Sequence, residues 1–429
     1  MSGLIGARIP RLEDGALLVG KGRFVDDIAR PGVWHAAFVR SPHPHAAIRG
    51  IGAHDALALP GVHAVLALDD LAPVLAKRRM LRHSNSGAPL DRYWSFALAD
   101  GEVSYVGEAV AIVLADNRYV AEDAAAKVAV DYDVLSSVSD CRSAVETTAP
   151  AVRRELNTNI AASYKVAYGD AEAAFAKAAH VFHEELWQHR GGAHPIEGRG
   201  ILAEWHDDTM TVWASTQKAH DLFQSLTALL DFDESRLRVA TPDVGGGFGP
   251  KLCVYPEDIA VVAAAKLLKR PIKWIEDRRE HFICANHSRQ QRHRVRAGVD
   301  ADGVILALDD EFWHDQGAYV RTHATRVATM ISGILPGPYR IPAYRSVGHF
   351  RLTNKTPAAT YRAPGRYETT FVRERLIEAV AHALKLDPVD VRRRNAIPAT
   401  EMPFRRRRAR SARSFGHDAR SSTWSSRPM

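Results

Sequence analysis

Two blocks of alternating apolar and polar residues predict an α+β fold for this chain. In the first block, apolar residues recur at helical spacing over 119–127, next to stretches rich in β-branched side chains. We therefore expect an α+β domain that ends near residue 135. Its predicted strands cover 33–39, 61–67, 103–114 and 128–134.

The second block follows linker-like sequence and again mixes strands with helices. A turn at Asp207-Asp208 between two β-type stretches predicts a hairpin. Ser215 and Thr216 precede an amphipathic stretch, so we expect a helix with a Ser or Thr N-cap that runs to about Leu230. The other predicted elements are strands at 180–188, 237–240 and 272–276, helices at 170–178, 256–269 and 371–384, and a short helix ending near Asn395.

Length and composition indicate a soluble globular protein. The 429 residues are 46% hydrophobic and 25% charged, which is ordinary for such proteins. No apolar run reaches the about 18 residues of a membrane span, and the N-terminus lacks a signal-peptide pattern. Cys141, Cys253 and Cys284 are widely spaced, so we expect neither disulfides nor a cysteine metal cluster. A cytoplasmic protein without a membrane span is predicted.

The basic character of the chain belongs to its last segment. The formal charge is +7, and residues 404–429 contain eight Arg and one Asp, so residues 1–403 carry no net charge. Because the body lacks a basic excess, no nucleic-acid partner is predicted. Residues 404–429 also lack apolar periodicity, so we expect a disordered basic tail. An alternative is a tail that binds RNA or an acidic partner.

A glycine-rich turn, Gly245–Lys251, stands between a predicted strand and a predicted helix. Four glycines within five positions leave backbone N–H groups uncovered, so an anionic group could approach closely. Two familiar phosphate loops are excluded, because Leu252 follows the lysine and Pro250 replaces the last glycine of a dinucleotide fingerprint. A tight structural turn is the simpler interpretation. It does not explain Phe248, a large ring inside the turn.

Four histidines form the densest group of potential metal ligands: His180, His183, His189 and His194. Residues three apart on a strand face opposite sides, so His180 and His183 are not expected to share a metal ion. Structural histidines are the expected interpretation, and no metal ligand is predicted.

Three junctions between predicted elements combine polar and glycine-rich groups: Gln217, Gly245–Lys251 and Arg362. A glutamine offers both a donor and an acceptor, exposed glycine amides can hold anions, and arginine makes bidentate contacts with phosphate or oxo groups. Each junction alone is compatible with an ordinary polar surface.

In their order along the chain and in their amino-acid sequences, these junctions resemble the molybdenum-binding large subunit of the xanthine dehydrogenase family, in particular its aerobic carbon-monoxide-dehydrogenase-like branch. The resemblance covers roughly residues 5–402. The matching stretches are Gly20-Lys-Gly-Arg-Phe-Val-Asp-Asp, Arg40-Ser-Pro-His, Pro195-Ile-Glu-Gly-Arg-Gly, Ser215-Thr-Gln, Asp243-Val-Gly-Gly-Gly-Phe-Gly-Pro-Lys, Asp315-Gln-Gly-Ala-Tyr and Tyr361-Arg-Ala-Pro-Gly-Arg.

The resemblance implies an α/β hammerhead domain at 18–135, a linker at 136–150 and the first molybdopterin-binding domain at 151–398. It also implies a molybdenum–molybdopterin cofactor, expected in its cytosine dinucleotide form. The residues that match the family's cofactor site are Gln217, Gly246, Gly247, Phe248, Gly249 and Arg362.

In that family a substrate carbon is hydroxylated with oxygen from water, and electrons leave through iron–sulfur clusters to FAD. The resemblance therefore implies a [2Fe-2S] small subunit and an FAD-binding medium subunit as partners. The family's general-base glutamate lies in a second cofactor-binding domain, beyond the stretch matched here. No catalytic residue is therefore predicted in this chain, which is expected to bind the cofactor weakly and to be inactive alone.

Two departures from the family bear on the substrate. Leu252 stands where purine-oxidising members carry a Glu, and an apolar side chain cannot hydrogen-bond a purine. Residues 363–365, Ala-Pro-Gly, replace the centre of the Cys-containing loop of carbon monoxide oxidisers. An aldehyde or an N-heterocycle is therefore the expected substrate.

The resemblance stops near Pro403. One interpretation of residues 404–429 is that they are translated out of frame, so that this chain is a C-terminally truncated form. The alternative function is a non-catalytic scaffold that docks the iron–sulfur and FAD partners.

Overall fold

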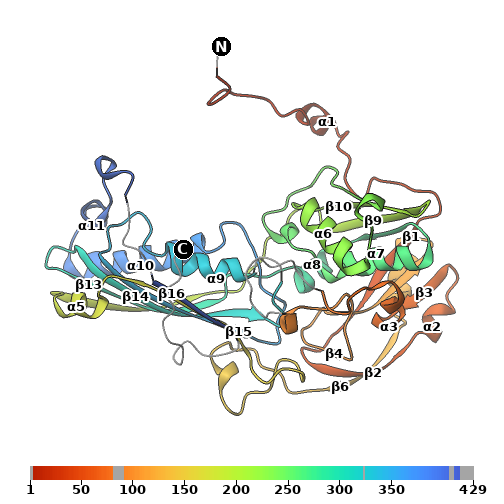
Figure 1. Ribbon diagram of the computed structural model, residues 1–429, viewed down its shortest axis with the longest axis horizontal. Coiled ribbons are helices and arrows are strands. Elements are labelled where there is room, and N and C mark those ends of the chain that lie inside the picture. The colour runs from red at the N-terminus through yellow and green to blue at the C-terminus, as the bar shows by residue number, and fades with distance from the viewer. Residues whose placement is uncertain (1–2, 81–90, 322–323, 405–409, 416–429) are drawn as a thin grey trace.

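The structure of the chain is a computed structural model. Two large β-sheets lie one after the other along its long axis (Figure 1). The structure describes residues 3–80, 91–321, 324–404 and 410–415. An arm carrying the short helix α1 (Asp14–Leu18) stands away from both sheets (Figure 1). Helices and strands are mixed throughout, so the predicted α+β class is confirmed.

The seven-stranded sheet combines strands from both predicted domains, in the order β11-β10-β9-β12-β1-β5-β3. The link is a short parallel pairing of β1 with β12, in which Trp34 lies opposite Ile272. The two predicted domains therefore share one sheet. Its strands are β1 (Trp34–Arg40), β3 (Val62–Leu66), β5 (Ala109–Ala115), β9 (Gly200–His206), β10 (Thr209–Ala214), β11 (Leu237–Ala240) and β12 (Ile272–Ile275).

Helix α7 (Pro256–Leu268) is the central helix of this half and packs against β9 and β12. Residues 259–265 are all buried, because alanines let the helix lie close to the sheet. The helix begins at Pro256 as predicted, and the Asp258 side chain accepts the N–H of Tyr255 at 2.9 Å. The other elements here are α2 (His54–Leu57), α3 (Leu68–Leu71), α4 (Arg118–Ala125), α6 (Ala219–Leu230) and α8 (Arg278–Cys284), with β2 (Ala46–Gly52), β4 (Glu102–Val103) and β6 (Ala129–Val134) in a three-stranded sheet.

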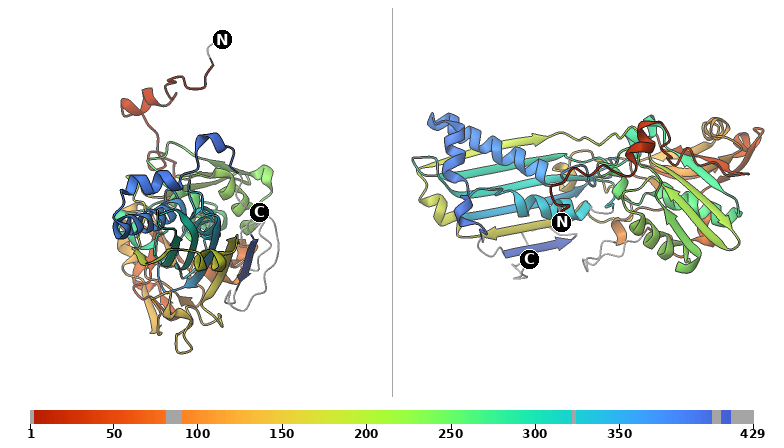
Figure 2. Two further views of the ribbon diagram at one scale, coloured as in Figure 1. Left: turned by 90° about the vertical axis from the view of Figure 1, so that its left-hand side faces the viewer. Right: turned by 90° about the horizontal axis from the view of Figure 1, so that it is seen from above.

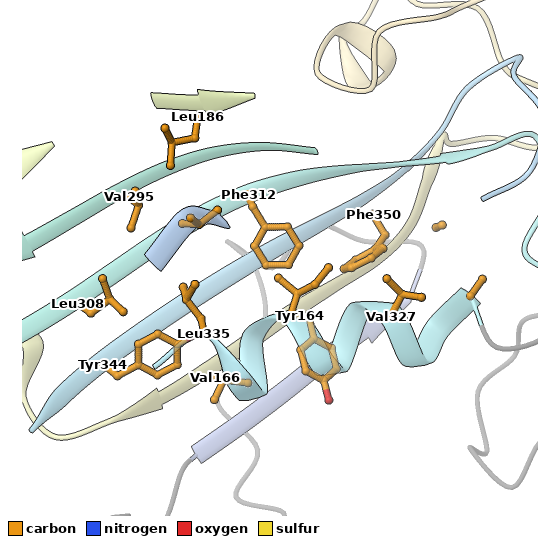
Figure 3. Close-up of a cluster of buried hydrophobic side chains, with 14 of the residues drawn as sticks. Tyr164, Val166, Leu186, Val295, Leu308, Phe312, Val327, Leu335, Tyr344 and Phe350 are labelled. Atoms are coloured by element: carbon orange, nitrogen blue, oxygen red, sulfur yellow. The ribbon is translucent and has the colours of Figure 1, made fainter. Parts of the chain in front are cut away.

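The six-stranded sheet has the order β16-β7-β15-β14-β13-β8, and helices α9 and α10 pack against it (Figure 2). Phe312 and Phe350 meet edge to face in its core, where Val327 of α9 and Leu335, directly after that helix, approach the sheet (Figure 3). The elements of this half are β7 (Ile160–Tyr168), α5 (Ala171–Ala176), β8 (His180–Gln188), β13 (Gln291–Val299), β14 (Ile305–Gly317), α9 (Ala324–Ile334), β15 (Ala343–Leu352), α10 (Arg366–Leu384), α11 (Pro388–Asn395) and β16 (Arg410–Phe415).

The prediction of a fully disordered tail is wrong for residues 410–415. These residues form β16, which pairs antiparallel with β7 at the edge of the six-stranded sheet. An edge strand offers unpaired backbone groups to any extended segment, so pairing here does not depend on an apolar sequence pattern. Residues 405–409 and 416–429 of the predicted tail lie outside the described residues. Within the described ranges, no helix has the length and apolarity needed to cross a bilayer.

A cluster of buried charges joins β1 to the elements around α7. Arg40 donates to Glu257 at 2.9 Å and to Glu280 at 2.8 Å. Arg199 donates to Glu257 at 3.1 Å and to Glu276 at 2.8 Å. Both arginines, Glu257 and Glu276 have side chains at most 8% exposed. Burial opposes ionisation of Glu257, but Arg199 and Arg40 lower its pKa to about 2.

Replacing Arg199 with Met is expected to lower the free energy of unfolding by about 3–5 kcal/mol, because the buried carboxylates of Glu257 and Glu276 each lose a charged partner. The matched control is Arg118→Met, which removes the exposed helix pair with Glu122 and costs about 0.5 kcal/mol or less. Urea denaturation at neutral pH measures both changes. Equal losses in the two variants would contradict the role given to the buried cluster.

The same cluster predicts how stability depends on pH. The pKa of Glu257 is lower in the folded chain than its ordinary value of 4.5. Its stabilising contribution is therefore fully present above about pH 5 and is lost as the pH falls towards about 2. Unfolding measured between pH 6 and pH 3 should show a steeper loss of stability in the wild type than in Arg199→Met.

Candidate cofactor-binding site

The glycine-rich turn connects β11 to α7 and bends sharply. Gly246, Phe248 and Gly249 have positive φ angles of 96°, 52° and 109°. A Cβ atom at Gly249 would lie 2.7 Å from the carbonyl oxygen of Thr360, so only glycine fits there. Phe248 holds a left-handed conformation that large residues rarely adopt, and its side chain is 48% exposed. Such strain is concentrated at functional sites.

Gln217 lies against this turn through two hydrogen bonds. Its backbone N–H donates to the carbonyl of Lys251 at 2.8 Å. Its side-chain oxygen accepts the N–H of Gly249 at 2.9 Å. The contact requires a glycine at the neighbouring position, because a Cβ at Gly247 would lie 2.4 Å from the Gln217 Cδ. The amide nitrogen of Gln217 has no acceptor among the described residues.

The predicted N-cap of helix α6 is wrong, and the reason lies in the same junction. α6 begins at Ala219 rather than directly after Ser215 and Thr216, and it lacks a side-chain cap. The Ser215 hydroxyl donates to Glu197 at 2.7 Å, and the Thr216 hydroxyl donates to the carbonyl of Lys251 at 3.2 Å. Both residues attach the segment before the helix to the glycine turn.

Arg362 lies against the other side of the turn. Its backbone N–H donates to the carbonyl of Phe248 at 2.8 Å. Arg289 supports this segment, because it donates to the carbonyl of Arg362 and forms a buried ion pair with Glu368 at 2.9 Å. The guanidinium group of Arg362 is exposed and has no partner in the part of the chain that the structure describes.

The three predicted junctions therefore meet at one place. Two donors on this turn and two on the segments beside it have no acceptor among the described residues, and we call these four groups the donor cluster. They are the backbone N–H groups of Gly247 and Phe248, the side-chain amide of Gln217 and the guanidinium of Arg362. Gly246 and Gly249 shape the turn and offer no free donor, since their N–H groups donate to Val244 and to Gln217. Such a set suits a group that carries phosphate or oxo oxygens.

Sequence reasoning missed the residues that hold the donor cluster in place. Glu197 stands in a stretch that matches the family, but nothing local marks it as a site residue. Lys251 belongs to the turn, yet its side chain points away from solvent and is 0% exposed beside Glu197. Burial lowers the pKa of Lys251, and Glu197 opposes that shift. The available signal in the sequence was a lysine within a glycine-rich turn. If such a lysine is buried, its charge needs a carboxylate partner.

The grouped histidines serve other contacts. His180 and His183 lie on β8, and His194 packs edge-on against Phe282 with ring centroids 4.7 Å apart. Across the described residues, no three His, Cys, Asp or Glu side chains are placed to share a metal ion.

Together, the fold and the donor cluster define a class of α+β protein in which backbone amides, a glutamine amide and an arginine meet without an acceptor among the described residues. Comparison with known families makes this specific. The molybdopterin cofactor-binding domain matches residues 152–396, and the a/b hammerhead domain of aldehyde oxidase and xanthine dehydrogenase matches residues 19–136. This chain belongs to the xanthine dehydrogenase family of molybdenum hydroxylase large subunits, with a hammerhead domain followed by a molybdopterin-binding domain.

Individual relatives agree with this placement. The chain is 37% identical, over 93% of its length, to 6-hydroxypseudooxynicotine dehydrogenase complex subunit gamma of Paenarthrobacter nicotinovorans. It is 32% identical, over 91% of its length, to the carbon monoxide dehydrogenase large chain of Hydrogenophaga pseudoflava. Quinoline 2-oxidoreductase from Pseudomonas putida 86 superimposes on 94% of the chain with a TM-score of 0.86 at 33% identity.

The chain spans about half the length of these relatives, with 50% of each of the two curated proteins and 51% of the quinoline enzyme covered. The nicotinate dehydrogenase large molybdopterin subunit of Eubacterium barkeri is different. At 28% identity, 89% of its length is covered by this chain. Family members therefore differ in how much sequence shares a polypeptide with these two domains.

Replacing Gly249 with Ala is expected to destabilise the chain by about 1–3 kcal/mol, because both the φ angle and the Thr360 carbonyl oppose a Cβ there. Gly191→Ala is the control, since a Cβ at Gly191 meets nothing within 4 Å. Thermal unfolding compares the two variants. A Gly249→Ala variant as stable as Gly191→Ala would show that the turn is not held as described.

Proposed function

We propose that this chain binds a molybdenum–molybdopterin cofactor through the donor cluster, as the cofactor-binding half of a molybdenum hydroxylase large subunit. The observation that supports the proposal is the set of four donors, on the strained turn and the two segments beside it, that have no acceptor among the described residues. The buried Arg199 and Glu257 of this half are, by contrast, paired with each other. Donors left unpaired at a site that three segments build together are best explained by a ligand.

The residues have distinct roles in this proposal. The amides of Gly247 and Phe248 and the side chain of Gln217 donate hydrogen bonds to oxygens of the cofactor. They do not coordinate its metal. Arg362 adds a positive charge, which strengthens hydrogen bonds to anionic oxygens. When bound, the cofactor supplies the two-electron oxidation chemistry. The chain's own residues hold and orient it, and the general-base glutamate of the family is expected outside this chain.

We further propose an N-heteroaromatic compound as the substrate. Two matched proteins are named for such compounds, namely hydroxypseudooxynicotine and quinoline. Leu252 offers no hydrogen bond to a purine, and residues 363–365 lack the cysteine expected for carbon monoxide oxidation. An aldehyde remains the competing substrate class.

The same proposal includes the partners. Relatives that are named as a large chain or as a complex subunit support a multi-subunit enzyme. We propose a [2Fe-2S] small subunit, an FAD-binding medium subunit, a cytosine dinucleotide form of the cofactor and a cytoplasmic location. We also propose that the chain alone is inactive and that a polypeptide equivalent to the rest of the relatives completes the pocket.

Replacing Arg362 with Met is expected to reduce retained molybdenum at least about tenfold, because a charge-assisted hydrogen bond contributes about 1.5–3 kcal/mol. The chain is expressed in a host that makes the cofactor, and molybdenum and pterin are measured after purification. Arg366→Met is the matched control, since Arg366 is equally exposed in the same segment. Equal retention in both variants would contradict the assignment of Arg362.

The scaffold alternative gives a different result in the wild-type chain. A scaffold that only docks the iron–sulfur and FAD subunits would bind those partners and contain neither molybdenum nor pterin. In a complex with all subunits, dye reduction with pyridine or quinoline substrates should exceed that with aldehydes, xanthine or carbon monoxide. Faster reduction with an aldehyde would overturn the proposed substrate class.

A further inference from the structure

One carboxylate oxygen connects the segments that build the donor cluster. Glu197 Oε2 accepts the backbone N–H of Gly245, the hydroxyl of Ser215 and the ammonium group of Lys251, each at 2.7 Å. We propose that Glu197 is the positioning residue of this site, which fixes both ends of the glycine turn and the segment that carries Gln217. The inference rests on the proposed function, because it explains how the donors are aimed at the cofactor.

The backbone geometry supports this role. The N–H of Glu197 also donates to the carbonyl of Gly245 at 3.2 Å, so the two segments pair in both directions. A Cβ at Gly245 would lie 2.5 Å from the Cβ of Glu197, so the glycine permits the close approach. Glu197 acts on Gly245 and leaves the amides of Gly247 and Phe248 free. It therefore orients the donor cluster without belonging to it.

The loop that carries Glu197 is itself firmly held. Two residues further on, Arg199 forms its buried ion pair with Glu276. Arg278 donates to the carbonyls of Pro195 and Ile196 on the other side. Because the residues on both sides of Glu197 are held in place, its hydrogen bonds fix the glycine turn relative to the buried charge cluster.

The charge of Glu197 matters as well as its shape. An ionised carboxylate can accept several hydrogen bonds at one oxygen, whereas a Gln side chain would lose the charge that pairs with Lys251. Lys251 is fully buried, so without Glu197 its ammonium group would lose its ion-pair partner inside the protein. Lys251 also presents its carbonyl to Gln217, so a displaced Lys251 would move that side chain too.

The test uses the full chain and hydrogen exchange of the peptide that covers residues 244–252. Glu197→Ala should speed amide exchange in this peptide at least tenfold and reduce retained pterin at least fivefold. Peptides from β13 and β14 should exchange as in the wild type. The control is Glu204→Ala, which removes a partly exposed partner of Arg30 away from the turn and should change neither readout.

A double variant separates positioning from simple charge neutralisation. Glu197→Ala with Lys251→Met removes the unpaired ammonium group, so the melting temperature should recover relative to Glu197→Ala. Fast exchange in 244–252 and low pterin retention should persist, since the bonds to Gly245 and Ser215 are still absent. Recovery of both readouts in the double variant would overturn the proposal. A wild-type chain without pterin would refute the proposed function, while the exchange data would still decide the role of Glu197.

Discussion

The buried carboxylate of Glu257 is the constraint on which the arrangement of this half depends. It stands at the start of α7, six residues after Lys251 of the glycine turn, and two arginines from distant segments form ion pairs with it there. Arg40 brings in the first strand of the hammerhead part, and Arg199 brings in the loop before β9. A charge with so little exposure is tolerated only with such partners, so all three segments must come together for the chain to fold. The exit of the glycine turn is thereby fixed.

Polar groups with and without protein partners distinguish the supporting structure from the candidate site. Around α7, Arg40, Arg199 and Glu257 are buried and form ion pairs that connect separate elements. The amides of Gly247 and Phe248 and the guanidinium of Arg362, by contrast, have no acceptor among the described residues, and Phe248 and Arg362 are exposed. The turn between them is strained at Phe248, whose φ is 52°. Rigid surroundings are what allow a strained loop to persist with its donors directed outwards.

Much of this could be predicted from the sequence because it is local. The strand at 180–188, the helix from Pro256 and the glycine turn follow from patterns within a few residues. The family resemblance indicated that the three junctions belong to one site. The shared sheet could not be predicted, because β1 meets β12 through two residue pairs between segments far apart in the chain. The start of α6 was mispredicted, because Ser215 has a typical capping side chain that a tertiary contact with Glu197 uses instead. The pairing of 410–415 depends on an open sheet edge rather than on its own composition.

The exposed donor cluster has the groups needed to bind an anionic group but lacks those needed for catalysis. Phe248 is 48% exposed and Ile196 is 96% exposed, so the described surface around the donor cluster is open to solvent. Ligand pockets usually bury most of the ligand and exclude water from the reacting atoms. One wall of donors is sufficient to bind and orient an anionic group, because each hydrogen bond needs only its own partner. Proton transfer requires a second group on the opposite side of the substrate, and the donor cluster contains no carboxylate that could accept a proton. The donor cluster can therefore account for the binding of an anionic group but not for proton transfer.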